Sequence, residues 1–92
     1  GMRLLEKTMT LANVAALKKE GIAAMDSGDT SIDLSAVTRA DSSAVSVLLS
    51  WERYAKEKGL TLQIAHVPSS LESLLVLYGV RSLFDRIIVR DN

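Results

Sequence analysis

The chain alternates between short β-rich runs and longer runs whose apolar residues recur at helical spacing. Leu60–Ala65 alternates strictly between apolar and polar residues, which is typical of a strand with one face against a core. The four predicted strands are Arg3–Met9, Thr30–Leu34, Leu60–Ala65 and Arg86–Arg90. Since helices separate these strands with short connections, the sequence predicts an α/β fold with parallel neighbouring strands in a mixed sheet. We expect one small domain over residues 1–92.

The first two predicted helices carry most of the apolar residues. The first begins with Thr10 as its N-cap and ends near Ser27–Asp29. The second runs from about Ser42 to Lys58, with Asp41 as its N-cap. The apolar positions of the first helix are Leu11, Val14, Leu17, Ile22 and Met25. Trp51 shares a face of the second helix with small and aliphatic residues, and this periodicity favours a core position over an anchor in a partner's groove.

The third predicted helix has signals at both ends. Ser69 and Glu72 fit a capping box, in which Ser69 is the N-cap and Glu72 reaches back to it. Gly79 supplies a left-handed residue that ends the helix, and Val80 follows where a Schellman-type contact would form. A loop over Ser35–Ala40 precedes the second helix.

Composition excludes several classes of function. Eleven basic and eleven acidic residues give a formal net charge of zero, and no basic stripe is visible, so we expect no nucleic-acid partner. The longest apolar runs, such as Leu74–Tyr78, fall well short of the roughly 20 residues of a membrane span, so we expect no direct membrane insertion. The absence of cysteine removes thiol chemistry, and the lack of a secretory signal makes a cytoplasmic location the default.

The sequence offers little for catalysis or for a cofactor. A nucleophilic serine needs a base within hydrogen-bond reach, and the only histidine, His66, follows a different strand. His66 also has no second histidine or carboxylate at a metal-ligand spacing, so a surface position at a strand edge is favoured. No glycine cluster forms a phosphate loop. We therefore expect no catalytic residue, no metal and no cofactor.

Two consecutive hydroxyls stand at the predicted start of the second helix. Ser42 and Ser43 directly follow Asp41. Unpaired backbone N–H groups and the positive dipole end favour an anion there, so a phosphate on Ser42 would be tolerated electrostatically. Ser42 is the phosphorylation candidate, with Ser43 second. The structural alternative is that Asp41 and Ser42 simply cap the helix.

Ile32–Ser35, Asp41–Val45 and the apolar helix that follows resemble the STAS domain of anti-sigma-factor antagonists. The resemblance implies a small α/β domain that docks onto a partner protein. In those antagonists a partner kinase phosphorylates the hydroxyl residue directly after the motif aspartate, which corresponds to Ser42. Ala44 stands where they usually have Gly.

Other segments are similar to the MlaB-type branch of the STAS family, namely Leu48–Trp51, Arg53–Gly59, Pro68 and Leu77–Val80. Those proteins belong to the Mla phospholipid-transport ABC system and bind its cytoplasmic ATPase. The resemblance implies a non-enzymatic regulatory subunit that acts at the inner-membrane face through its partner. The implied partner-binding residues are Thr38, Arg39, Asp41, Ser42 and Ser43. The alternative is an anti-sigma-factor antagonist whose partner is an anti-sigma kinase.

Family members generally begin with an extra strand before the position of Arg3–Met9. A shortened or missing first strand leaves one sheet edge exposed, where another chain can pair. A homodimer through this edge is therefore a further expectation.

Overall fold

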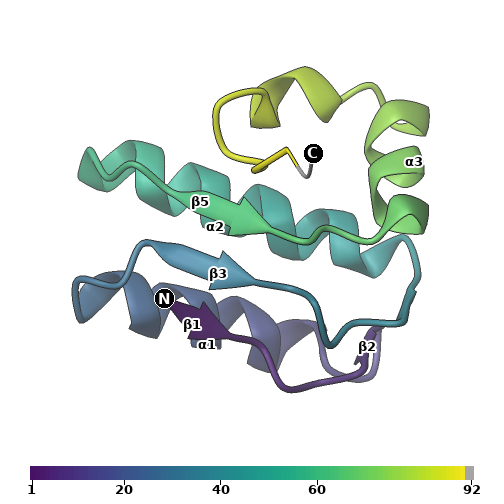
Figure 1. The fold of residues 1–92 in the computed structure, drawn as a ribbon, viewed down its shortest axis with the longest axis horizontal. Coiled ribbons are helices and arrows are strands. Elements are labelled where there is room, and N and C mark those ends of the chain that lie inside the picture. The colour runs from purple at the N-terminus through teal and green to yellow at the C-terminus, as the bar shows by residue number, and fades with distance from the viewer. Residues whose placement is uncertain (91–92) are drawn as a thin grey trace.

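The computed structural model describes residues 1–90 (Figure 1). Its helices in this range are α1 (Val14–Asp26), α2 (Ser43–Lys58), α3 (Ser69–Leu77) and the 3₁₀ helix η1 (Arg81–Phe84). Its strands are β1 (Met2–Arg3), β2 (Thr8–Met9), β3 (Ser31–Asp33), β4 (Arg39–Ala40) and β5 (Gln63–Ala65). None of the helices in residues 1–90 is long and apolar enough to span a membrane.

The strands form two small parallel sheets. The first has the order β1-β3-β5, with Met2 opposite Ile32 and Ile32 opposite Ile64. The second pairs β2 with β4. The predicted α/β class is confirmed, but every strand pair within residues 1–90 is parallel, where a mixed sheet was expected.

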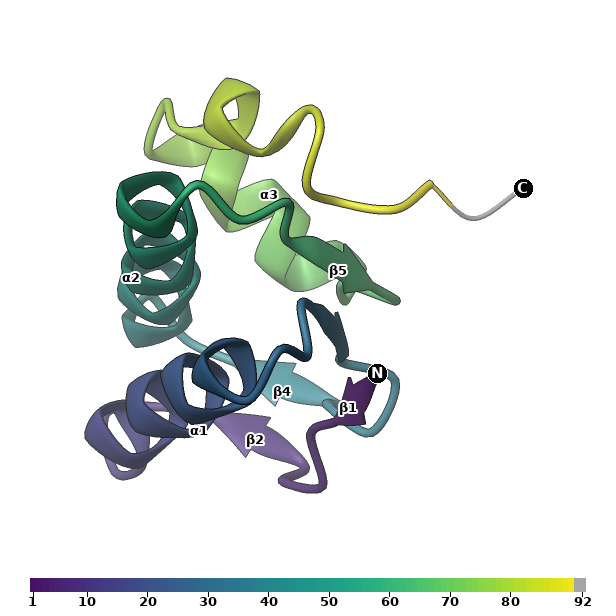
Figure 2. The same ribbon diagram turned by 90° about the vertical axis from the view of Figure 1, so that its left-hand side faces the viewer.

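Helices α1 and α2 lie side by side against one face of the β1-β3-β5 sheet (Figure 2). Residues alternate across a strand, so each strand sends one set of side chains toward these helices. Ile32 and Ile64 are fully buried on this side, whereas Ser31 and Gln63 are exposed. The inward and outward alternation predicted for Leu60–Ala65 is thus confirmed, although the regular strand is shorter.

Two of the predicted strands differ in the structure. Arg3–Met9 is interrupted: β1 and β2 are separate and belong to different sheets, and the segment between them begins with a 3.0 Å bond from the Leu4 N–H to the Asp33 carbonyl. Arg86–Arg90 forms no strand beyond a single bridge between Ile88 and Ile64. There the N–H groups of residues 87 and 88 bond back to the Phe84 carbonyl at 3.0 and 2.9 Å, so they cannot join a ladder.

The predicted N-caps of two helices are wrong. Helix α1 has Asn13 as its N-cap residue, and Thr10 lies in the preceding turn. Helix α3 has Pro68 as its N-cap residue and no side-chain capping hydrogen bond, so Ser69 and Glu72 form no capping box. The reason for the second error is that the Glu72 carboxylate accepts a 3.0 Å bond from the Arg81 guanidinium instead.

The predicted glycine at the end of α3 is confirmed. Gly79 has a φ of +72°, in the left-handed region. The Val80 N–H donates to the Leu75 carbonyl at 2.9 Å, and the Gly79 N–H donates to the Val76 carbonyl at 3.0 Å. These two bonds are the pair that defines a Schellman motif.

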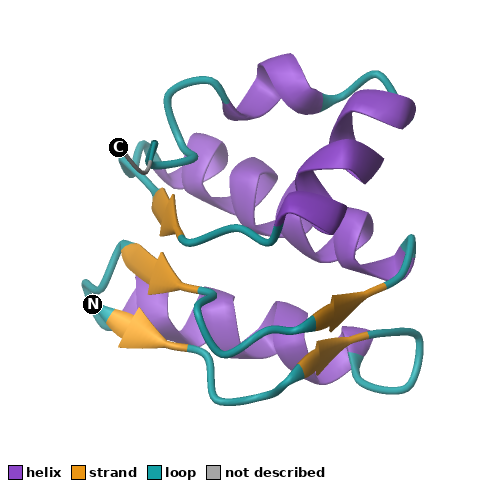
Figure 3. Cartoon of the chain, turned by 45° about the vertical axis from the view of Figure 1, so that its right-hand side comes forward, coloured by secondary structure: helices purple, strands orange, loops and turns teal. Residues whose placement is uncertain are grey.

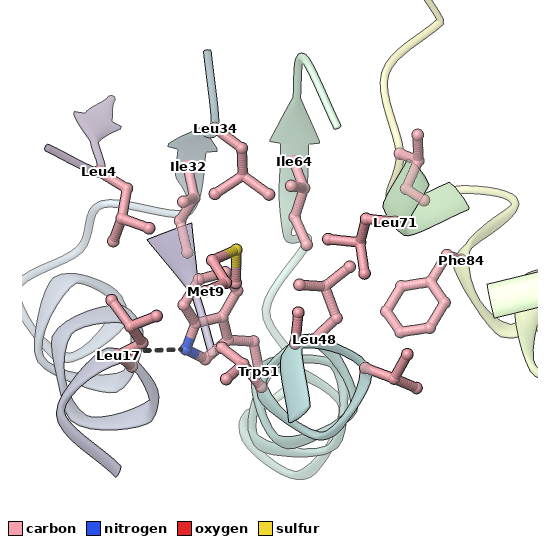
Figure 4. Close-up of a cluster of buried hydrophobic side chains, with 14 of the residues drawn as sticks. Leu4, Met9, Leu17, Ile32, Leu34, Leu48, Trp51, Ile64, Leu71 and Phe84 are labelled. Atoms are coloured by element: carbon pink, nitrogen blue, oxygen red, sulfur yellow. Dashed lines mark hydrogen bonds between the residues drawn. The ribbon is translucent and has the colours of Figure 1, made fainter. Parts of the chain in front are cut away.

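Trp51 lies in the centre of the core between α1 and α2 (Figure 4). Its side chain is fully buried, and its indole N–H donates to the carbonyls of Leu17 and Lys18, both at 3.2 Å. The predicted core position is therefore confirmed. The indole reaches the backbone of α1 because Gly21, which has no Cβ, faces it.

We expect Gly21→Ala to destabilise the protein. Replacing a glycine inside a helix by alanine normally stabilises by about 1 kcal/mol. Here the new Cβ would overlap the Trp51 ring, and such overpacking costs about 1–3 kcal/mol. Urea unfolding followed by circular dichroism measures the change. Combining Gly21→Ala with Trp51→Phe should recover part of the loss, whereas an unchanged or higher stability of Gly21→Ala alone would contradict this packing.

Candidate functional site

Four of the five predicted docking residues lie on the segment that connects β3 to α2 and includes β4, and the fifth, Ser43, is the first residue of α2 (Figure 3). The loop predicted over Ser35–Ala40 therefore contains a short strand at its end. Thr38, Arg39, Asp41 and Ser42 are exposed, and Ser43 is half-buried.

This segment is held against β2. The Thr38 backbone N–H and hydroxyl both donate to the Lys7 carbonyl, at 2.8 and 3.2 Å. The Asp41 N–H donates to the carbonyl of Met9 at 3.1 Å, and Met9 is fully buried. The exposed residues are thus fixed to the core by main-chain bonds on both sides of β4.

Asp41 caps α2 as predicted, although the N-cap position falls one residue later. Its Oδ1 accepts the Ser43 N–H at 2.8 Å, and its carbonyl accepts the Ala44 N–H at 3.0 Å. Ser42 occupies the N-cap position with helical angles, φ −61° and ψ −22°, and its side chain makes no capping hydrogen bond. The Asp41 side chain therefore caps the helix, and the Ser42 side chain takes no part in capping.

The residues after the hydroxyls anchor the start of α2. Ala44 and Val45 are buried in the core, at 0% and 6% exposure. The Ser46 hydroxyl donates to the Ser43 carbonyl at 2.7 Å within the first turn. A rigid helix start consequently presents Ser42 at the surface.

A second polar cluster lies at the carboxyl ends of β3 and β5, and sequence reasoning missed it. Asp33 Oδ1 accepts the Ser35 N–H at 2.8 Å and lies 3.0 Å from His66 Nδ1. The hydrogen bond from the Ser35 backbone, followed by those from His66 and the Ser35 side chain, lowers the pKa of Asp33. His66 is exposed at the end of its strand, as expected, with a φ of +58°. The parallel register brings the pair together across 33 positions of sequence.

These groups do not assemble a metal site. Among residues 1–90, no three His, Cys, Asp or Glu side chains are grouped closely enough to hold a metal ion.

Leu11 was also misplaced by the sequence pattern. It was assigned to the apolar face of the first helix, but it precedes α1 and is 76% exposed. Its N–H donates to Asp41 Oδ2 at 3.4 Å, which places it beside the start of α2. The misassignment arose because helical spacing continues through the turn before the helix begins.

Together, these features describe a small α/β domain in which main-chain bonds and the Asp41 cap fix a hydroxyl-bearing helix start at the surface. A family model described as "Mlab, STAS domain" matches residues 5–89. The chain therefore belongs to the STAS family, whose domains act through protein–protein interactions.

A solved structure supports the same fold. The chain is similar to the anti-sigma factor antagonist SpoIIAA in its unphosphorylated form, with a TM-score of 0.64 and 15% sequence identity. The match covers 98% of this chain and 77% of that chain. Comparison with curated protein sequences gives no match.

We expect Asp41→Ala to lower the free energy of unfolding by about 1 kcal/mol, the usual cost of removing a side-chain cap. The substitution leaves the Ser43 and Leu11 N–H groups without their carboxylate acceptor. Asp41→Asn retains an oxygen acceptor and serves as the matched control, because Asn and Asp cap helices about equally well. Thermal unfolding compares the three proteins, and equal loss in both variants would show that charge rather than capping is responsible.

Proposed function

We propose that this chain is a non-enzymatic regulatory subunit, a single STAS domain over residues 1–92, that binds the cytoplasmic ATPase of an Mla-type phospholipid-transport ABC transporter. The docking surface consists of Thr38, Arg39, Asp41, Ser42 and Ser43. We refer to these five residues as the α2-start surface.

One observation carries the proposal: the Ser42 hydroxyl stands exposed at a helix start that Asp41 already caps. Since the local backbone does not need this hydroxyl, it is available to a partner. The surface around it is preorganised by main-chain bonds to β2, which reduces the entropy lost on association. The description of the matched family model as Mlab favours an Mla-type partner.

The charges near this surface also suit protein docking. Arg39 is exposed on β4 and takes part in no ion pair found within residues 1–90. An unpaired guanidinium beside hydroxyls can bind a carboxylate in a bidentate manner. We infer that the partner surface supplies an acidic group next to hydrogen-bonding groups.

We expect Ser42→Lys and Ser42→Asp both to weaken capture of the ATPase by about ten-fold or more, since either side chain fills the space that close docking requires. A pull-down with the purified ATPase, followed by titration calorimetry, measures the loss. Ser82→Lys is the control, because Ser82 is an exposed serine on η1, away from the α2-start surface.

The two Ser42 variants also separate two mechanisms. Weaker binding by both variants, whose side chains carry opposite charges, indicates that steric fit governs docking. Loss with Ser42→Asp alone indicates that a negative charge governs it. Undiminished binding by both variants would place the interface elsewhere on the molecule.

An anti-sigma-factor antagonist switched by phosphorylation of Ser42 is the second candidate function. The observation that favours it is the exposure of this hydroxyl, together with the structural similarity to SpoIIAA in its unphosphorylated form. A phosphate adds a charge of about −2 at neutral pH, which would break a packed interface by repulsion and desolvation.

Intact-mass measurement after incubation with candidate anti-sigma kinases tests this alternative. The expected result is uptake of one phosphate by the native chain and by Ser43→Ala, and none by Ser42→Ala. Uptake that persists in Ser42→Ala, or no uptake by the native chain, would count against the switch.

Two finer proposals concern assembly and location. β1 lies at one end of the sheet order β1-β3-β5, and its free edge supports pairing with a second copy. Light scattering would then report a mass near twice the 10.0 kDa of one chain, and a monomer mass at all concentrations would contradict it.

Binding to the ATPase would hold the subunit in the cytoplasm at the inner-membrane face, with no nucleic acid and no cofactor involved.

A further inference from the structure

The turn over residues 10–13, which precedes α1, is held in a fixed shape by one side chain. Asn13 Oδ1 accepts the Thr10 N–H at 3.0 Å, and Asn13 Nδ2 donates to the Thr8 carbonyl at 2.8 Å. The Asn13 N–H also donates to the Thr10 carbonyl at 3.1 Å. Asn13 occupies the N-cap position of α1 but makes no capping bond. Its amide is committed to the turn instead of to the helix.

Leu11 projects from this turn with 76% of its surface exposed, a larger fraction than any other large apolar residue within residues 1–90. Its N–H donates to Asp41 Oδ2 at 3.4 Å, while Oδ1 of the same carboxylate accepts the Ser43 N–H at 2.8 Å. One carboxylate thus ties the turn before α1 to the start of α2. The position of Leu11 relative to Ser42 is therefore set by bonded groups on both sides.

A single exposed leucine is common on protein surfaces and by itself indicates nothing. Leu11 differs because two polar side chains, Asn13 and Asp41, fix the backbone that carries it. A binding hot spot is a side chain buried in a well-packed pocket and surrounded by contacts that exclude water, and preorganisation lowers the entropy lost when such a side chain is buried. The hydroxyls and Arg39 of the α2-start surface supply those surrounding contacts.

The charge pattern of the chain favours a protein over a membrane as the occupant. Binding at a lipid surface requires a broad apolar face and attraction of basic residues to anionic lipids. This chain has a net charge of zero, and Leu11 is the one large exposed apolar residue bonded to the start of α2. A single apolar side chain that projects from a fixed turn fits a recess in a protein better than it fits a lipid surface.

We propose that Leu11 is the apolar anchor of the α2-start surface, and that it inserts into an apolar recess on the partner protein beside the groups that contact Ser42. This inference rests on the proposed function and adds a specific requirement to it. The partner must present a hydrophobic pocket next to its polar contacts, and the turn before α1 must form part of the interface.

Titration calorimetry of the purified chain against the Mla-type ATPase tests the proposal. Leu11→Ala and Leu11→Gln should each bind about ten-fold more weakly or worse, the usual effect of truncating an apolar anchor. Asn13→Ala, which frees the turn but keeps Leu11, should cause a smaller loss. Leu83→Ala is the matched control, because Leu83 is also exposed but lines a pocket at the C-terminal end of α2.

Since Leu11 lies outside the core, its variants should keep the native circular dichroism spectrum and melting temperature. Binding of both Leu11 variants at native strength would overturn the inference while the Ser42 variants still test the proposed function. Equal weakening by Leu83→Ala would overturn the assignment of the anchor to Leu11. Failure of the native chain to bind the ATPase would reject the proposed function itself, and the anchor with it.

Two other occupants would also overturn the inference. If Leu11→Ala abolishes sedimentation of the chain with anionic phospholipid vesicles, the leucine contacts lipid. If it converts a dimer to a monomer in light scattering, the leucine contacts a second copy. The expected result is that neither measurement changes with the substitution.

Discussion

The contact between Trp51 and Gly21 determines how the two long helices pack. The indole has no solvent exposure, and its N–H is shared between two carbonyls of α1. An aromatic ring can approach a helix backbone this closely only where the facing residue lacks a Cβ. Further along the same interface, the Tyr54 hydroxyl donates to the Asp26 carboxylate, and this bond raises the pKa of Tyr54. The two helices are therefore joined by polar bonds as well as by apolar packing.

The location of the α2-start surface follows from this packing. Once α2 is fixed against α1, the buried Ala44, Val45 and Leu48 hold its first turns in the core. The β2–β4 ladder and the Asp41 cap then leave the connecting segment little freedom. A functional loop supported by rigid elements keeps its side chains in a defined geometry, which is what recognition by a partner requires.

Features that depend on nearby residues could be predicted from the sequence. The extent of α2, the core position of Trp51 and the left-handed Gly79 all follow from helical periodicity or from residues within one turn. Features that depend on contacts with residues further along the chain could not be predicted. The Ser69–Glu72 box failed because Arg81, nine residues further along, takes the Glu72 carboxylate.

The same limit applies to the candidate site. Its residues were predicted as one segment, and the cap on α2 was assigned to Asp41 from local pattern alone. The position of Leu11 depends on an Asp41 contact across 30 positions, and the pairing of Asp33 with His66 spans 33. Contacts of this kind arise from strand register and helix packing, and no local pattern in a single sequence contains them.

The hydrogen bonds at the start of α2 constrain how any phosphate on Ser42 could act. A phosphate at a helix N-terminus usually gains from free backbone N–H groups. Here Asp41 already accepts the Ser43 and Ala44 N–H groups, and the Ser42 carbonyl accepts that of Val45. The added charge would also lie beside the Asp41 carboxylate, which offsets the attraction of the helix dipole. Phosphorylation would therefore do little to reorganise the helix, and its effect would fall on the partner that docks there. The proposed docking and switching would thus be two uses of one surface, and both would depend on the Ser42 hydroxyl taking no part in capping the helix.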